Sequence, residues 1–294
     1  MEGRWDEAAL FAALVTGSFI KFAFSYFTWR KRQKSLQYVG EISELYIYPV
    51  KSCAGVKVDQ VECSKLGVTC GHVSDRHWML IDKNNKLITQ RKCPRLVLVK
   101  PSIRDNALCL DAPGMETLTL KPRGPGEIGQ VIQTDLFGDA VKAVECCSKA
   151  SAWFSAYLKK PGCRLVYAHP TVTRRQINKS PPLLTVPLLA KPEDSDLSAF
   201  PDWAPYSLLS EASIADVNSR LPDNCKKAGV LNFRPNMVVK DCGCYEEDNW
   251  CEIYIGQQTK FRNLKKTLKC ILTTVDPDTG EMGENMEPLR TLRR

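Results

Sequence analysis

The sequence predicts an α+β fold that is mostly β, built as two β-rich lobes and preceded by a single N-terminal membrane-anchor helix. Three observations indicate this fold: a 22-residue apolar stretch near the start, many short β-type runs separated by turn signals, and only two amphipathic helical patterns in the rest of the chain. A chain of 294 residues can form one large domain or two ordinary ones. We expect four segments: residues 1–40 (anchor and basic flank), 41–169 (first lobe), 170–205 (connecting loop) and 206–294 (second lobe).

The predicted anchor is the apolar stretch Ala8–Trp29, because about 20 such residues span a bilayer core as a helix. Its single charge, Lys21, costs about 2.5–3.5 kcal/mol at the centre of a span. Lys21 lies roughly 12 Å along a helix from Trp29, so its long stem can carry the ammonium group toward the membrane surface.

Charges on either side of the stretch predict its orientation. Basic residues follow it at Arg30, Lys31, Arg32 and Lys34, whereas the seven residues before it are net acidic. The positive-inside rule then leaves the folded body in the cytosol. A cleaved signal peptide is the alternative, but the sequence has neither a basic start nor a small-residue cleavage site there. The outer mitochondrial membrane and the endoplasmic reticulum both stay open.

Short β-type runs follow from Glu41 onward. Turn signals such as Lys83-Asn84-Asn85 and Gly124-Pro125-Gly126 separate many of them. The predicted strands of the first lobe are Leu45–Val50, Trp78–Ile81, Leu87–Gln90, Leu96–Val99, Leu108–Leu110, Thr117–Leu120, Val131–Thr134, Val141–Val144 and Cys163–Ala168.

Two helices are predicted, one in each lobe. The first has Ser148 as its N-cap and ends at Pro161-Gly162, and the second begins at Ser210. Between the lobes, residues 170–205 are rich in proline, and a loop of this length is usually functional or a linker. The predicted strands of the second lobe are Asn236–Val239, Glu252–Ile255 and Cys270–Val275.

Composition limits the classes of function. Hydrophobic residues make up 44% and charged residues 25%, which excludes disordered, collagenous and polytopic membrane proteins. The net charge is +8, but the first 34 residues hold 6 basic and 3 acidic side chains, so the remaining 260 carry about +5. That charge is too small for bulk nucleic-acid binding, and we expect no nucleic-acid partner. It suits a protein that holds one small, strongly anionic ligand.

Cysteine is in excess, with 13 residues. An odd number spread over a long chain does not indicate a disulfide framework, so we expect a reducing compartment and mostly buried thiols. The sequence has no GxGxxG, GxxxxGK[ST], HExxH or CxxC motif. The spacing of Cys70, His72 and His77 matches no standard zinc site, and that of Cys242, Cys244 and Cys251 indicates a surface loop.

Four basic or thiol-bearing positions stand out by their context. Lys51 and Ser52 follow a strand, Arg76 precedes the next, and Arg234 lies just before Pro235. Cys270 follows Lys269, whose charge favours the thiolate form that binds a soft metal. Fixed cations suit a small anionic ligand, and a thiolate suits a soft metal.

The motifs around these residues, YPVKS, DRHWMLID, NFRPN and KCILTTVDPDTG, occur in this order along the chain. Together they resemble the MOSC family, and within it the mitochondrial amidoxime-reducing components, from about Ile42 to about Leu292. The resemblance implies a MOSC-type β-barrel lobe beside an N-terminal β-rich lobe.

The resemblance also implies a cofactor, Mo-molybdopterin, and the residues that bind it. Cys270 matches the cysteine that ligates the metal and is the implied catalytic residue. Asp202, Trp203 and Ala204 fall where the family places a further cofactor-binding stretch, although their residue types differ from the family pattern. The other positions implied to bind or flank the cofactor are Lys51, Ser52, Arg76, Arg234, Asn236, Leu268 and Lys269.

The implied activity is reduction of N-hydroxylated substrates such as amidoximes. The implied electron source is NADH, through NADH-cytochrome b5 reductase and cytochrome b5, because the chain has no flavin, haem or nicotinamide motif of its own. The implied location is the outer mitochondrial membrane with the body facing the cytosol, with the endoplasmic reticulum and peroxisomal membranes as alternatives.

The residues after DPDTG differ from the family pattern, and the sequences of the family continue beyond the position that matches Arg294. We therefore expect a C-terminally truncated isoform with an exposed sheet edge. Two other hypotheses stay open: a carrier module that transfers sulfur or cofactor through Cys270, and a catalytically silent isoform.

Overall fold

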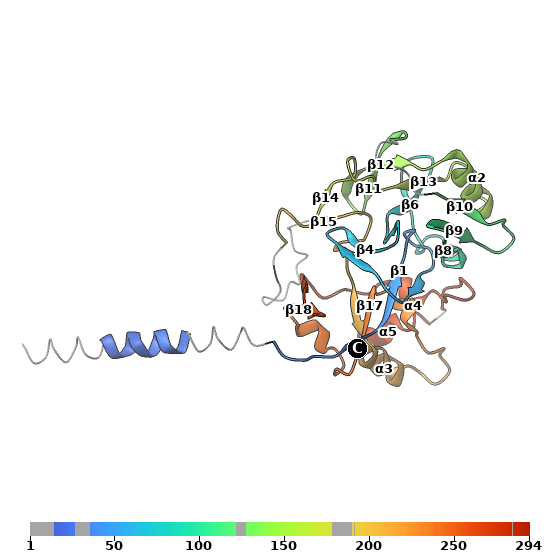
Figure 1. The fold of residues 1–294 in the computed structure, drawn as a ribbon. Coiled ribbons are helices and arrows are strands. Elements are labelled where there is room, and N and C mark those ends of the chain that lie inside the picture. Colours follow the sequence, from blue (N-terminus) through green and yellow to red (C-terminus); the bar gives the residue numbers. More distant parts are fainter. Residues whose placement is uncertain (1–14, 27–35, 122–127, 178–189, 191, 284) are drawn as a thin grey trace, which may run out of the picture. The chain divides into compact units, whose positions relative to one another are not determined.

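The computed structural model describes residues 15–26, 36–121, 128–177, 190, 192–283 and 285–294. The chain divides into two units, Met1–Val39 and Gly40–Arg294 (Figure 1). In the first unit, residues 15–26 are helical. Across the described residues, no helix combines the length and the apolar character that crossing a membrane requires. The predicted anchor, Ala8–Trp29, lies partly outside the described residues and stays a prediction.

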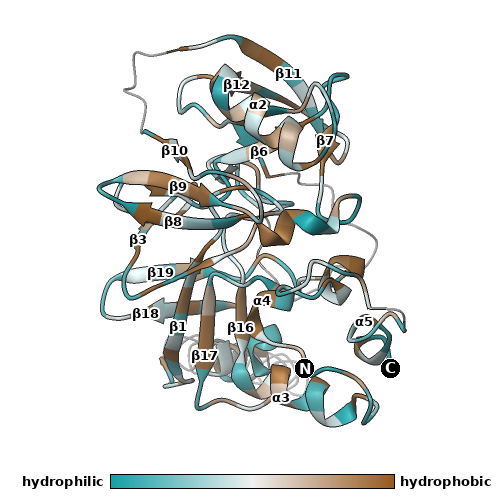
Figure 2. Cartoon of the chain, turned by 90° about the vertical axis from the view of Figure 1, so that its right-hand side faces the viewer, coloured by the Kyte–Doolittle hydropathy of each residue, from teal (hydrophilic) through white to brown (hydrophobic). Residues whose placement is uncertain are grey.

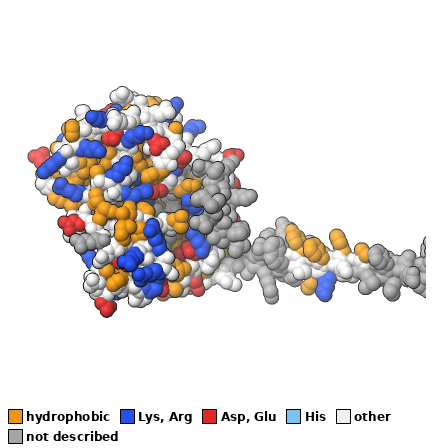
Figure 3. All heavy atoms as spheres, turned by 180° about the vertical axis from the view of Figure 1, so that it is seen from behind, with side chains coloured by type: hydrophobic (Ala, Val, Ile, Leu, Met, Phe, Trp, Pro, Cys, Tyr) orange, Lys and Arg blue, Asp and Glu red, His pale blue; other side chains and the backbone are white. Residues whose placement is uncertain are grey.

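The unit Gly40–Arg294 is mostly β with few helices, which confirms the predicted fold class at that level. Its described strands form six sheets, and none of their strand orders closes into a barrel. Basic side chains are spread around a central apolar area on the face that Figure 3 shows. The division of this unit into two lobes joined by a loop stays a prediction.

A four-stranded sheet joins two strands from the start of this unit to two strands from much later in the chain. β1 pairs with β2 and β17 in antiparallel fashion, with Leu45 opposite both Val58 and Met237, and β16 pairs with β17 in parallel. Apolar residues run along β1, β17 and β16, which lie side by side in Figure 2. In spatial order the strands are β16 (Leu208–Ser210), β17 (Met237–Lys240), β1 (Glu41–Ile47) and β2 (Val56–Val58).

A five-stranded and a three-stranded sheet contribute most of the remaining core. Helix α2 (Ser148–Tyr157) packs Trp153 and Phe154 into the same cluster as Leu80 and Leu165. The five-stranded sheet has the order β11 (Val131–Leu136), β12 (Asp139–Glu145), β13 (Arg164–Tyr167), β6 (Trp78–Ile81) and β7 (Leu87–Ile88). The three-stranded sheet has the order β10 (Leu118–Leu120), β9 (Ala107–Asp111) and β8 (Lys100–Arg104).

The other elements are short. The small sheets are formed by β3 (Glu62–Ser64), β4 (Gly67–Cys70) and β5 (Val73–Ser74), by β14 (Arg175–Gln176) and β15 (Leu197–Ser198), and by β18 (Glu252–Ile255) and β19 (Thr259–Arg262). The helices besides α2 are α3 (Glu211–Arg220), α4 (Val230–Phe233), α5 (Leu289–Leu292) and the 3₁₀ turns η1 (Pro94–Leu98), η2 (Glu246–Asn249) and η3 (Ile271–Thr274).

Two predicted strands are wrong. Leu96–Val99 falls largely on η1, where Pro94 supplies a helical φ and no donor for a sheet. Cys270–Val275 is replaced by η3, where the Thr273 hydroxyl donates to the Cys270 carbonyl at 2.9 Å. Such a local bond competes with strand pairing. Helix α2 has Cys147, not Ser148, as its N-cap.

The predicted helix after Ser210 is confirmed as α3. Ser210 is its N-cap, and the Ser210 hydroxyl accepts from Ser213 N at 3.1 Å. The same hydroxyl donates to Glu247 Oε1 at 3.0 Å, which ties η2 to the start of the helix.

We expect Ser210→Ala to lower the free energy of unfolding by about 1–2 kcal/mol, because it removes the N-cap acceptor. The measurement is the urea midpoint of the full chain. Ser219→Ala is the matched control, since Ser219 is exposed on the same helix. Equal midpoints for the two variants would contradict the capping role.

Candidate active site

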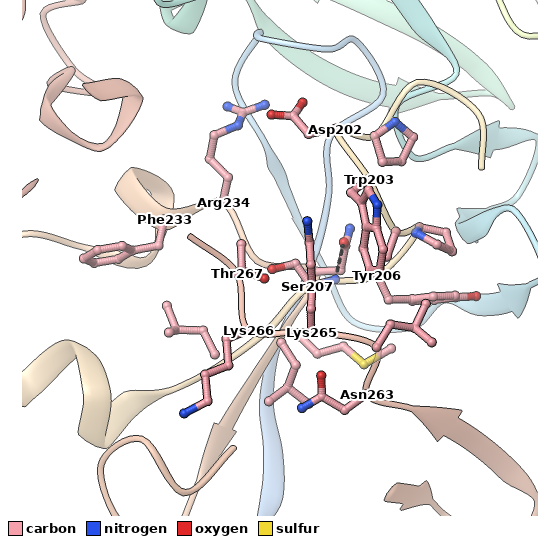
Figure 4. Close-up of a pocket in the computed structure, with 18 of the residues that line it drawn as sticks. Asp202, Trp203, Tyr206, Ser207, Phe233, Arg234, Asn263, Lys265, Lys266 and Thr267 are labelled. Atoms are coloured by element: carbon pink, nitrogen blue, oxygen red, sulfur yellow. Dashed lines mark hydrogen bonds between the residues drawn. The ribbon is translucent and has the colours of Figure 1, made fainter. Parts of the chain in front are cut away.

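A cavity of about 1060 Å³ lies within the unit Gly40–Arg294 (Figure 4). The structure brings together all eleven residues that the sequence analysis singled out, since each of them lines this cavity. They come from distant parts of the chain: the segment after β1, the turn before β6, the approach to β16, the end of α4 and the segment before η3. Their roles in binding a cofactor stay predictions.

Lys51 is a buried cation at the wall of the cavity. Its backbone N–H donates to Trp78 O at 2.7 Å, next to the isolated bridge between Val50 and Trp78. Its Nζ donates to Phe200 O at 2.8 Å and pairs with the Asp202 carboxylate. Burial lowers the pKa of Lys51 to about 8, although Asp202 opposes this shift. Ser52 follows with a left-handed backbone, φ 74°.

Arg76 is held at several points. Its backbone also lies in the left-handed region, with φ 49°, and its N–H donates to Tyr48 O at 2.8 Å. Its guanidinium pairs with Asp75 and donates to Arg234 O at 3.1 Å. A weaker bond reaches Asn236 Oδ1 at 3.4 Å. Arg76 is therefore fixed relative to the NFRPN segment.

Arg234 and Asn236 come from that segment. Arg234 is the C-cap of α4 with φ 58°, and its Nη1 donates to Cys53 O at 2.6 Å. Burial lowers the pKa of Arg234 to about 10, which still leaves it charged at neutral pH. Asn236 is buried, donates to Tyr46 O at 3.2 Å and accepts from Ser207 N at 3.2 Å.

The segment before η3 carries the predicted metal ligand. Cys270 is the N-cap of η3 in an extended conformation, and its thiol is free and partly exposed. Burial, helped by the Arg76 charge, lowers the pKa of Lys269 to about 8. The Lys269 ammonium lies 5.9 Å from the ring centroid of Phe233. Leu268 is 73% exposed.

The stretch Asp202–Ala204 forms another part of the wall. Asp202 binds Lys51, and Arg91 lies 3.5 Å from its other carboxylate oxygen. Burial alone would raise the pKa of Asp202, but the charge and hydrogen bond of Lys51 together with the charges of Arg76 and Arg91 outweigh it, and the net shift is downward. The Lys265 ammonium lies 4.1 Å from the ring centroid of Trp203, and the two side chains are adjacent in Figure 4.

The charge of the wall fits a strongly anionic ligand such as a pterin phosphate. Ten lining residues are Lys or Arg and four are Asp or Glu. Within the described ranges, neither Arg234 nor Lys269 forms a direct ion pair with a carboxylate. Buried charges without a partner are costly, and an anionic ligand in the cavity would offset that cost. The Cys270 thiol lines the same cavity, and a thiolate is the kind of ligand that a soft metal prefers.

Two residues that the sequence analysis missed support the site from behind. Asp75 is fully buried, accepts from Tyr48 N at 2.7 Å and pairs with Arg76. Tyr48 is also fully buried and lies against both arginines. Asp75 could have been found from its position in DRHWMLID, since a carboxylate beside a candidate phosphate-binding arginine is a natural partner. Nothing local indicated the role of Tyr48.

The low pKa values of Lys51 and Lys269 predict that anion binding weakens above about pH 8. We expect sulfate, which is dianionic throughout, to bind the cofactor-free protein about tenfold or more weakly at pH 9.5 than at pH 7, because each lost charge weakens a charge-assisted hydrogen bond. Calorimetric titration measures this. The double variant Lys51→Met/Lys269→Met is the control and should have a flat profile; a steep one would contradict the assignment.

The lowered pKa values of Lys51 and Lys269 also make the stability of the folded protein depend on pH. Both lysines have folded-state pKa values below the ordinary 10.5, so the unfolded chain binds more protons between about pH 8 and 10.5. The contribution of these two groups to the free energy of unfolding therefore rises with pH across this window.

Comparison with known proteins places these observations in a family. The chain matches the MOSC N-terminal beta barrel domain over residues 39–161 and the MOSC domain over residues 197–294. A solution structure of a protein from Bordetella bronchiseptica aligns with 37% of this chain and 86% of its own, at 24% identity and a TM-score of 0.30, which supports no argument.

Three similar relatives carry related names. Mitochondrial amidoxime reducing component 2 of Bos taurus is 40% identical over 269 residues, which cover 90% of this chain and 76% of that protein. Mitochondrial amidoxime-reducing component 1 is 37% identical in Mus musculus over 269 residues and in Homo sapiens over 270, covering 90% of this chain and 75% and 76% of theirs. The chain belongs to the mitochondrial amidoxime-reducing component family of MOSC proteins.

Proposed function

We propose that this protein is a molybdenum-cofactor-dependent reductase of N-hydroxylated substrates, which include amidoximes, N-hydroxyguanidines, hydroxamic acids and hydroxylamines. The names of its relatives support N-reduction in general. The observation that carries the proposal is a cavity whose wall holds the Cys270 thiol together with an excess of basic side chains.

The basic residues of the wall would hold the cofactor. Lys51, Arg76 and Arg234 are the cations that would bind the phosphate of the pterin, and their burial strengthens each interaction. Asn236 and the left-handed Ser52 would shape the surface beside them. The Cys270 thiol would ligate the metal.

When bound, the cofactor supplies two-electron redox chemistry at the metal, and the overall reaction converts N–OH to N–H and water with two electrons and two protons. Lys269 would hold one of these protons at Nζ, since its side chain lines the same cavity as Cys270. The partly exposed position of Cys270 would let a small substrate reach the metal.

We propose that electrons come from NADH through NADH-cytochrome b5 reductase and cytochrome b5. We further propose a location at the outer mitochondrial membrane, with the unit Gly40–Arg294 facing the cytosol. The names of the relatives support a mitochondrial location, and the basic cluster after Trp29 supports the orientation.

The test is turnover by the full chain, produced in a host that makes the cofactor. Molybdenum is measured by elemental analysis and pterin by fluorescence after oxidation. We expect near-stoichiometric metal and pterin, and reduction of benzamidoxime when NADH and both electron-transfer proteins are present. Bound cofactor without turnover would favour a carrier module, and a folded protein without cofactor would contradict the proposal.

A further inference from the structure

Tyr48 lies behind the cavity wall, in contact with two of the cations that face the cavity. The Arg234 Cζ lies 4.3 Å from its ring centroid and the Arg76 Cζ lies 4.8 Å from it. The ring is fully buried and does not itself line the cavity. Any effect of Tyr48 on a ligand must therefore act through the two arginines.

Hydrogen bonds hold the Tyr48 main chain, and Gly55 packs against the ring. Tyr48 N donates to Asp75 Oδ1 at 2.7 Å, and Tyr48 O accepts from Arg76 N at 2.8 Å. Gly55 lies against the ring, and a Cβ at residue 55 would be only 2.4 Å from Tyr48 Cε1. A side chain at residue 55 would therefore displace the ring from the arginines.

An aromatic ring can hold a guanidinium without using its hydrogen-bond donors. Arg has five N–H donors, and a carboxylate partner would use two of them and cancel the charge. A ring face attracts the cation through its quadrupole and leaves both the donors and the charge in place. Arg234 fits this description, because among the described residues its side chain donates one hydrogen bond, to Cys53 O, and its guanidinium lies against the Tyr48 ring.

The hydroxyl of Tyr48 is not part of this arrangement. Its oxygen is buried and has no hydrogen-bond partner among the described residues. Burial raises the pKa of Tyr48, so the hydroxyl stays protonated and does not act as a counter-ion for the arginines. The ring alone is left to account for the contact.

We propose that Tyr48 is a positioning residue whose ring orients Arg234 for a phosphate group in the cavity while leaving its charge and most of its donors available to that group, and that the same ring packs against Arg76, which Asp75 already pairs. This inference rests on the proposed function, because the phosphate would belong to the cofactor. It adds a residue outside the cavity wall to those that determine cofactor affinity.

The experiment compares Tyr48→Leu with two matched variants of the full chain. Tyr48→Phe keeps the ring and removes the hydroxyl. Tyr157→Leu removes a similarly buried ring that has an arginine, Arg95, 5.2 Å from its centroid, but neither residue lines the cavity. Calorimetry measures the affinity of each cofactor-free variant for inorganic phosphate at pH 7, and fluorescence measures the pterin retained after dialysis. Urea midpoints report the loss of packing common to both leucine variants.

We expect Tyr48→Leu to weaken phosphate binding by about tenfold or more and to lose most of its pterin, as removal of a desolvated cation–π contact predicts. Tyr48→Phe and Tyr157→Leu should stay within about twofold of the wild type. Equal phosphate affinity in the two leucine variants, or no phosphate binding by the wild type, would overturn the inference.

A second variant covers the case in which Tyr48→Leu does not fold. Gly55→Ala keeps Tyr48 but pushes its ring, so we expect a smaller loss of phosphate affinity in the same direction; an unchanged affinity counts against the inference. A wild type that holds no pterin contradicts the proposed function, and the phosphate titrations then still decide the role of Tyr48.

Discussion

Cys270→Ser is expected to abolish reduction of N-hydroxylated substrates, with a loss of activity of more than about 100-fold. Removing a residue that only supports a metal ligand costs about 10- to 100-fold, and removing the ligand itself should cost more. The serine hydroxyl has nearly the same volume but is a hard donor that stays protonated at neutral pH, so it does not replace a thiolate on a soft metal. The fold should survive, because η3 is anchored through the Cys270 carbonyl, which accepts from Thr273 N at 3.0 Å and from the Thr273 hydroxyl.

The measurement is benzamidoxime turnover together with the metal and pterin content of the purified protein. Cys63→Ser is the matched control, since Cys63 is a free thiol that lines the same cavity and is more exposed than Cys270. It should keep wild-type activity. Retained turnover in Cys270→Ser, or an equal loss in both variants, would remove Cys270 from the role of metal ligand.

Arg234→Ala has the second largest expected effect, a loss of cofactor retention by about ten- to 100-fold. Arg234 is buried, faces the cavity and forms no carboxylate ion pair within the described part of the chain. In Figure 4 its guanidinium lies at the same end of the cavity as Asp202. A charge-assisted hydrogen bond contributes about 1.5–3 kcal/mol, which corresponds to this range of affinity.

The measurement is the pterin content of the Arg234→Ala protein after dialysis. The melting temperature of the cofactor-free protein checks that the variant folds. Arg220→Ala is the control, because Arg220 pairs with Asp216 at 2.6 Å outside the cavity wall. It should retain pterin fully. An Arg234→Ala protein that keeps its pterin through dialysis would show that the phosphate is bound elsewhere.

Local sequence signals predicted much of the fold. The alternation and turn residues located β6, β9, β12 and β18 to within a few residues, and Ser210 marked the first turn of α3. These elements are short and their signals lie within them. The prediction failed at η1, where Pro94 has a helical φ and lacks a donor for a sheet, and at η3, where two threonine hydroxyls donate to nearby carbonyls in place of a partner strand.

The residues of the candidate site could also be predicted, because the sequence motifs contain most of them and the order of the motifs identifies the family. What the sequence by itself determined is therefore the mostly β class, the principal elements and the identity of Lys51, Arg76, Arg234 and Cys270 as candidates.

Only the tertiary structure decided how these residues meet. The pairing of β1 with β17 joins segments almost 200 positions apart, and it brings Tyr48, which follows β1, against Arg234, which precedes β17. The Asp202 contact with Lys51 likewise crosses about 150 positions. No local periodicity encodes such contacts, because they depend on which strands pair and which side chains share a buried, low-dielectric wall. The unpaired charge of Arg234 and the ring that holds it emerge only from that arrangement.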